Sequence, residues 1–145
     1  MKELKFIKIT SPDIFRLIPK HLFEQIGGRS WQVDRLLKMN PLSLISGCNY
    51  FWVLVNNDSE VKGILWAVID VLSEKLNVIA FEIDEEYQCE SDIEMALQFL
   101  RSAIKEFNLL DSGTVLKDKI NWVTNDPEKF KQFGGAMPET VLIEI

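Results

Sequence analysis

The sequence predicts one α/β domain of the mixed α+β kind, in which a mostly antiparallel central sheet carries helices on both faces. Three successive strand-like segments in the middle of the chain are apolar on both of their alternating faces, and such a sheet is normally covered on both sides. Helical patterns precede and follow these segments. The length of 145 residues and the apolar fraction of 47% suit one domain, residues 1–145, with a sizeable core.

The chain is expected to begin with a short strand and an interrupted helix. Apolar and basic residues roughly alternate over residues 4–9, as in a strand. Ser11, Pro12 and Asp13 form a helix start, since they supply a capping hydroxyl, a proline at the first helical position and an early acid. Pro19 should kink or split this helix. A second helix is predicted over about residues 31–39, before an Asn-Pro pair.

The central segments read as an antiparallel meander. Strands are predicted over residues 50–55, 61–72 and 76–83, with turns at 56–59 and 73–75. After a polar stretch, the strongest helical pattern of the chain spans residues 92–108. Its apolar stripe consists of Ile93, Ala96, Leu97, Leu100, Ile104 and Phe107.

The last third of the chain is expected to add a strand, a helix and a strand. The strand is predicted around residues 120–124, and Asp126 and Pro127 open a short helix that two glycines close at 134–135. Residues 141–145 read as a terminal strand. The predicted order is therefore β-α-α-β-β-β-α-β-α-β.

Composition excludes several classes of function. A net charge of −6 disfavours nucleic acid and anionic membranes and favours a protein partner with a basic surface. Since no apolar run approaches the length of a membrane span, a cytoplasmic location, or a virion if the chain is phage-encoded, is expected. Cys48 and Cys89 are expected to be free thiols, and the single histidine, His21, excludes a two-histidine metal site.

The order of elements and three local segments resemble the GNAT N-acetyltransferase superfamily. Residues 63–70 are similar to its third strand, 78–88 to its fourth strand entering the cofactor loop, and 130–134 to its late helix. The short, acid-rich form is similar to small GNAT-like proteins of bacteriophages. The resemblance implies that acyl-CoA would lie between the fourth and fifth strands, with its pyrophosphate on backbone amides at the start of the following helix.

The resemblance places the cofactor loop at residues 88–93, where this chain departs from the family pattern. Gln88 fits, but Ser91 and Ile93 stand where the family has small residues that let phosphate approach. Acids surround the loop, with no Lys or Arg between Lys75 and Arg101: Asp84, Glu85, Glu86, Glu90, Asp92 and Glu94. Ser91 and Glu94 also predict a capping box that would close the helix start without a ligand. We therefore predict a degenerate CoA loop and no cofactor, with acetyl-CoA only if the chain is an enzyme.

Catalytic residues of the family are also hard to find here. Phe130 stands where many members place a proton-donating tyrosine, and Tyr87 is expected to pack at the loop. Glu82 and Asp84, at the end of the fourth strand, are the candidate bases for an amine. The alternative interpretation is that both are ordinary acids at a strand end.

Three functions remain open from the sequence. The first is a non-catalytic binding or structural protein with the GNAT fold, such as a phage component that engages another protein. The second is a divergent acyl-CoA-dependent N-acetyltransferase that uses Glu82 or water as its base. The third, a small-molecule or metal binder that uses the acidic loop, lacks an ordered ligand spacing.

Overall fold

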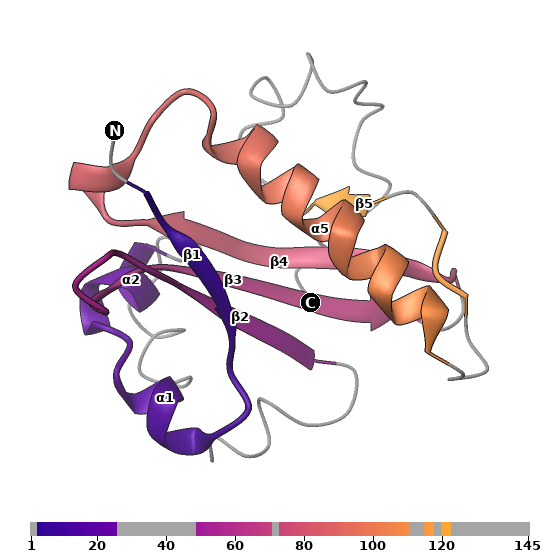
Figure 1. The fold of residues 1–145 in the computed structure, drawn as a ribbon, viewed down its shortest axis with the longest axis horizontal. Coiled ribbons are helices and arrows are strands. Elements are labelled where there is room, and N and C mark those ends of the chain that lie inside the picture. Colours follow the sequence, from indigo (N-terminus) through magenta and orange to yellow (C-terminus); the bar gives the residue numbers. More distant parts are fainter. Residues whose placement is uncertain (1–2, 26–48, 71–72, 111–114, 118–119, 123–145) are drawn as a thin grey trace, which may run out of the picture.

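The computed structural model describes residues 3–25, 49–70, 73–110, 115–117 and 120–122, which form one sheet with helices on both faces (Figure 1). In chain order the elements are β1 (Lys5–Lys8), α1 (Pro12–Arg16), α2 (Lys20–Gln25), β2 (Asn49–Val55), β3 (Val61–Asp70), β4 (Lys75–Ile83), the 3-10 helix η1 (Glu85–Tyr87), α5 (Asp92–Leu109) and β5 (Ile120–Trp122). The helices predicted over residues 31–39 and from residue 126, and the strand over 141–145, lie outside the described residues.

The described strands form a five-stranded sheet in the order β1-β2-β3-β4-β5. The first four are antiparallel neighbours, as the predicted meander requires. The fifth pairs with β4 in parallel, since α5 carries the chain back along the sheet before β5 begins. The predicted α+β fold class with a mostly antiparallel mixed sheet is therefore confirmed.

One face of the sheet is covered by the two short helices near the N-terminus. The backbone N–H of Asp13 donates to the hydroxyl of Ser11 over 3.3 Å, which caps α1 as predicted. Pro19 separates α1 from α2, because its ring interrupts the helical hydrogen bonds. The buried core on this face consists of Ile9, Ile18, Leu22, Phe51, Val53, Val55 and Ile64.

The opposite face is covered by α5, which crosses it diagonally (Figure 1). Ala96, Leu100 and Ile104, from the predicted apolar stripe, are buried against the sheet. The rings of Phe6 and Phe99 stack with centroids 4.1 Å apart and join α5 to the edge strand β1. Among the described residues, this helix has an acidic loop at its N-terminal end and a pocket along its C-terminal half.

Candidate functional site

The region that the resemblance assigns to a cofactor lies at the end of β4, where the chain continues into α5. Among the described residues, β4 pairs with β5 over residues 76–78 and 120–122. No described strand pairs with residues 79–83 on that side of β4.

A β-bulge at Ile79 determines which face of the sheet each side chain at the end of β4 lies on. Trp66 pairs with Ala80, and the next residue of β3, Ala67, pairs with Val78, so Ile79 has no cross-strand partner. The extra residue keeps Phe81 and Ile83 on the α5 face, where they join the core. The intervening acids, at positions 82 and 84, therefore face the α1 and α2 side of the sheet.

The candidate base Asp84 meets the only histidine of the chain on this second side. Nε2 of His21, on α2, lies 3.2 Å from Oδ2 of Asp84. The Asp84 side chain is 20% exposed and that of His21 is 51% exposed, so the pair lies at a partly open surface. Glu82 is half-buried on the same side of β4. The sequence singled out Asp84 but gave His21 no role, because only the fold brings α2 to the end of β4.

Side-chain hydrogen bonds and packing hold the segment that leads from β4 to the loop. Tyr87, on η1, packs against the core beneath α5, and its hydroxyl lies 3.1 Å from Nδ2 of the buried Asn56. Asn56 in turn accepts the backbone N–H groups of Asp58 and Glu60 in the β2–β3 turn. Gln88 donates from Nε2 to the carbonyl of Ile83 over 2.9 Å. The start of the cofactor loop is therefore fixed by internal hydrogen bonds.

The predicted capping box between Ser91 and Glu94 is wrong. Ser91 is the N-cap of α5 but makes no side-chain cap bond, since its φ of −92° and ψ of 9° lie outside the extended region that aims an N-cap side chain at the helix. The carboxylate of Asp92, in the first turn, bonds back to the preceding loop instead. It accepts the backbone N–H of Cys89 over 2.9 Å and the Cys89 thiol over 3.0 Å. One of the two bonds of a capping box is thus made two residues earlier, by Cys89 and Asp92.

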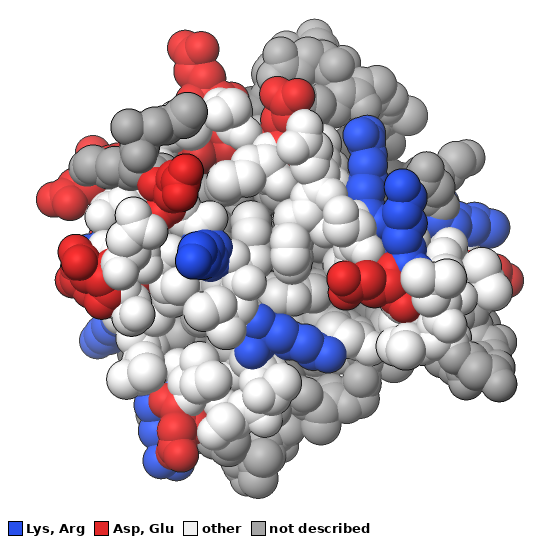
Figure 2. Space-filling view, viewed as in Figure 1, with Lys and Arg blue, Asp and Glu red and all other residues white. Residues whose placement is uncertain are grey.

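The loop is acidic on its surface but is not fully closed. Glu85, Glu86, Glu90 and Glu94 are exposed, and Figure 2 shows acidic side chains gathered at the upper left, over the segment between β4 and α5. The half-buried Ile93 stands in the first turn of the helix. In the part of the chain that the structure describes, no acceptor is present for the backbone N–H of Ile93 or Glu94.

Other kinds of site are absent from the described ranges. Residues 3–25, 49–70, 73–110, 115–117 and 120–122 contain no group of three or more His, Cys, Asp or Glu side chains that could hold a metal ion. No helix among them is long and apolar enough to cross a membrane. Cys89 is a free, exposed thiol, as predicted. Cys48 and Phe130 lie outside the described residues.

Comparison with solved structures identifies the fold. The glucosamine-6-phosphate N-acetyltransferase of Arabidopsis thaliana matches with a TM-score of 0.65 and 11% identity over 99% of this chain and 98% of that one. A GNAT-family acetyltransferase of Staphylococcus aureus matches with a TM-score of 0.58 and 19% identity over 91% and 79%. The chain has the GNAT fold. A predicted acetyltransferase of Clostridium acetobutylicum, solved with acetyl-CoA, matches with a TM-score of 0.59 and 12% identity over 98% and 96%.

No family model matches the sequence, and no curated protein does. At these identities the GNAT fold indicates only where a cofactor would bind. Any activity depends on the side chains that this chain places there. On one side of the sheet lies an acidic loop with an internal hydrogen bond between Cys89 and Asp92. On the other side lies the pair of His21 and Asp84.

Proposed function

We propose that this GNAT-fold chain is a non-catalytic binding protein whose acyl-CoA loop no longer holds the cofactor. The observation that carries the proposal is the 2.9 Å hydrogen bond between the carboxylate of Asp92 and the backbone N–H of Cys89. The start of a helix following such a loop attracts an anion. Here the Asp92 carboxylate, in the first turn of α5, already accepts the loop N–H of Cys89, so a phosphate group that used this N–H would have to displace it.

Charge adds to this obstruction. Glu90 is exposed within the loop and Glu94 within the first turn of α5. Each unit charge about 6 Å from a phosphate raises its free energy by about 0.7 kcal/mol in a water-like dielectric. The chain has no Lys or Arg from residue 76 to residue 100 to offset these terms. CoA, a polyanion, is therefore disfavoured at this loop.

The same charges favour a protein partner with a basic surface. Exposed acids line the segment between β4 and α5, and the whole chain carries a net charge of −6. Complementary charge speeds association and selects among partners more than it adds affinity. A partner of this kind should therefore bind less tightly as salt concentration rises.

Calorimetric titration with CoA and with acetyl-CoA at moderate salt tests the proposal. We expect no heat of binding at ligand concentrations below about 1 mM, which corresponds to a binding free energy weaker than about −4 kcal/mol. A micromolar dissociation constant for either ligand would overturn the proposal.

A second candidate, an acyl-CoA-dependent N-acetyltransferase, is favoured by the His21 and Asp84 pair. The imidazole of His21 would accept the proton of an amine as its nitrogen attacks the thioester carbonyl, and Asp84 would orient the ring. The carbon–sulfur bond would then break and CoA would leave. The open N–H groups of Ile93 and Glu94 would be available for a phosphate.

Release of free thiol from acetyl-CoA in the presence of a panel of amines distinguishes the two functions. The first predicts no release above the rate without protein. The second predicts release that His21→Gln lowers by about 100-fold, the lower range for loss of a general base. Release that is equal in the His21→Gln variant would exclude this pair as the base.

A further inference from the structure

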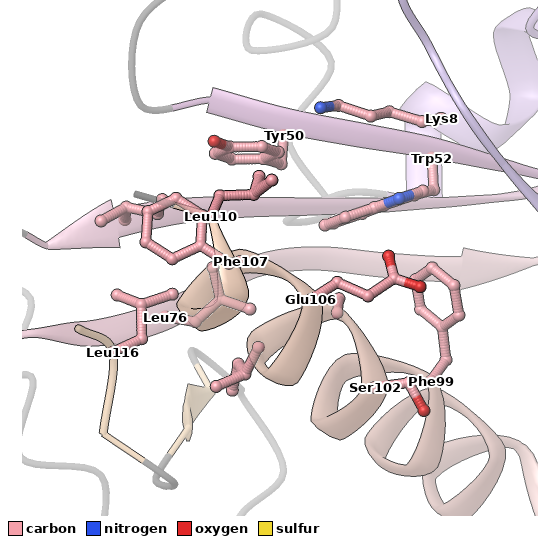
Figure 3. Close-up of a pocket in the computed structure, with 13 residues that line it drawn as sticks. Lys8, Tyr50, Trp52, Leu76, Phe99, Ser102, Glu106, Phe107, Leu110 and Leu116 are labelled. Carbon is pink, nitrogen blue, oxygen red and sulfur yellow. The ribbon is translucent and has the colours of Figure 1, made fainter. Parts of the chain in front are cut away.

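A pocket of about 400 Å³ lies far along α5 from the cofactor loop. It opens between the β1–β2 edge of the sheet and the C-terminal half of α5 (Figure 3). None of its lining residues lies between positions 77 and 98, so it shares no residue with the loop or with the histidine–aspartate pair. Its volume falls within the range of small-molecule sites, roughly 300–1,000 Å³.

Two aromatic walls face each other across this pocket. Tyr50 and Trp52 extend from β2, and Phe99 and Phe107 extend from α5 (Figure 3). Trp52 and Phe99 meet edge to face with centroids 5.4 Å apart. The floor is formed by buried aliphatic side chains of Ile69, Leu76, Ile104 and Leu116. Such a lining favours a flat apolar group, because aromatic rings pair at centroid separations of about 4.5–7 Å.

The rim of the pocket carries one positive and one negative side chain. Nζ of Lys8 lies 4.6 Å from the centroid of the Tyr50 ring, and Glu106 extends from α5 on the other wall (Figure 3). Among the described residues, neither has an ion-pair partner, and the two do not pair with each other. Both charges therefore remain available to a ligand.

We propose that this pocket binds a small zwitterionic ligand with an aromatic ring, of the chemical class of the aromatic amino acids. The ring would lie beside the Trp52–Phe99 contact, between Tyr50 and Phe107, with the carboxylate near Lys8 and the ammonium near Glu106. A ligand with a single charge would be attracted by one rim residue and repelled by the other. A zwitterion satisfies both, so its complementarity is the greater. This proposal is independent of whether the loop binds CoA.

Four probes with one ring system and different charges test the proposal: L-tryptophan, tryptamine, indole-3-propionate and 3-methylindole. Binding is measured by calorimetry and by ligand-observed NMR on the full chain. We expect L-tryptophan to bind most tightly and each singly charged probe to bind about two- to fivefold more weakly, the effect of one exposed ion pair. Absence of binding by all four probes up to about 1 mM would overturn the proposal.

Charge variants test which rim residue binds each charged group of the ligand. Lys8→Met should weaken L-tryptophan and indole-3-propionate by about two- to fivefold and slightly tighten tryptamine, because it removes a like charge. Glu106→Gln should weaken L-tryptophan and tryptamine and slightly tighten indole-3-propionate for the same reason. Lys5→Met on β1 and Glu94→Gln on α5 are matched controls that do not line the pocket, and neither should change any affinity. If neither rim substitution changes the affinity of any probe, the zwitterion assignment is overturned.

Filling the pocket tests whether the probes enter it. Ala103→Phe places a ring among the lining residues and should abolish binding of all four probes. Ser102→Phe, at an exposed lining position of the same helix, serves if the first variant does not give a cooperative thermal transition. Undiminished binding in a folded filling variant would place the probes elsewhere and overturn the proposal.

Discussion

The two ends of α5 differ in the side chains that surround them and in the space that those side chains leave. At the N-terminal end, Asp92 bonds to the loop backbone, and exposed acids surround the place where the fold would accept an anion. At the C-terminal end, aromatic side chains leave a pocket of about 400 Å³ whose two rim charges have no ion-pair partner among the described residues. One helix thus joins a loop that its own side chains partly occupy, which we call the closed end, to a pocket that is left open.

We infer from this difference that a shared fold need not carry a shared ligand. The helix start and the bulge at Ile79 are backbone features, and the N–H groups of a helix start favour an anion. The side chain of Asp92 then takes the Cys89 backbone N–H. We therefore propose that a few side chains decide which end of α5 binds a ligand.

The largest expected effect comes from loosening the helix that joins both ends. Leu100 is fully buried against the sheet, and Leu100→Ala should lower the free energy of unfolding by about 2–5 kcal/mol. The exposed neighbour substitution Gln98→Ala should change it by less than about 0.5 kcal/mol. Urea denaturation measures both. A small loss in Leu100→Ala would mean that α5 is not the shared support of the two regions.

The next effect should open the closed end. Glu90→Lys, Asp92→Ser and Ile93→Gly together remove the competing carboxylate, one repelling acid and one crowding side chain. We expect calorimetry to detect CoA with a dissociation constant near about 0.1 mM, a gain of at least tenfold. The glycine should lower the free energy of unfolding by up to about 1 kcal/mol.

The double variant Glu90→Lys with Ile93→Gly is the matched control, because it keeps Asp92. If it gains as much CoA affinity as the triple variant, the Asp92 carboxylate is not the obstruction. If the triple variant folds and still fails to bind CoA, the obstruction lies outside the loop, and the explanation of the closed end is wrong.

Most of the described fold could be predicted from the sequence because its signals are local. Pro19 divides α1 from α2 by removing hydrogen bonds. The stripe that includes Ala96, Leu100 and Ile104 repeats at helical spacing, and burial follows it. The three central strands are bounded by turn residues and are apolar on both faces.

The arrangement of the candidate site could not be predicted, because it depends on single backbone events. Strict alternation from Leu76 would place Asp84 on the α5 face, and the bulge at Ile79 turns it toward His21. The Ser91 box failed because that residue, with a ψ of 9°, lies outside the extended N-cap region, and its hydroxyl lies 3.3 Å from the Cys89 thiol. The pocket joins β1, β2 and α5 across long stretches of sequence, and no motif encodes it.

A smaller effect tests the corrected helix cap. Asp92→Asn should lower the free energy of unfolding by about 0.5–2 kcal/mol, since it weakens the bond to the Cys89 N–H and removes a negative charge from the first turn. Glu94→Gln, which keeps the length of a side chain that makes no cap bond, should change it by no more than about 0.5 kcal/mol. Thermal and urea denaturation compare the two. Equal losses would mean that only helix-dipole charge is being measured and that the cap bond contributes nothing.

The smallest effect separates the two bonds that Asp92 accepts. One comes from the backbone N–H of Cys89 and the other from its thiol. Cys89→Ser keeps both donors, and Cys89→Ala keeps only the backbone donor. A thiol is a weak donor and this one is exposed, so both variants should stay within about 0.5 kcal/mol of the parent in urea denaturation. If Cys89→Ala instead loses as much stability as Asp92→Asn while Cys89→Ser does not, the thiol is the bond that closes the loop. The loop amide would then be open to an anion after all, and the contrast between the two ends of α5 would disappear.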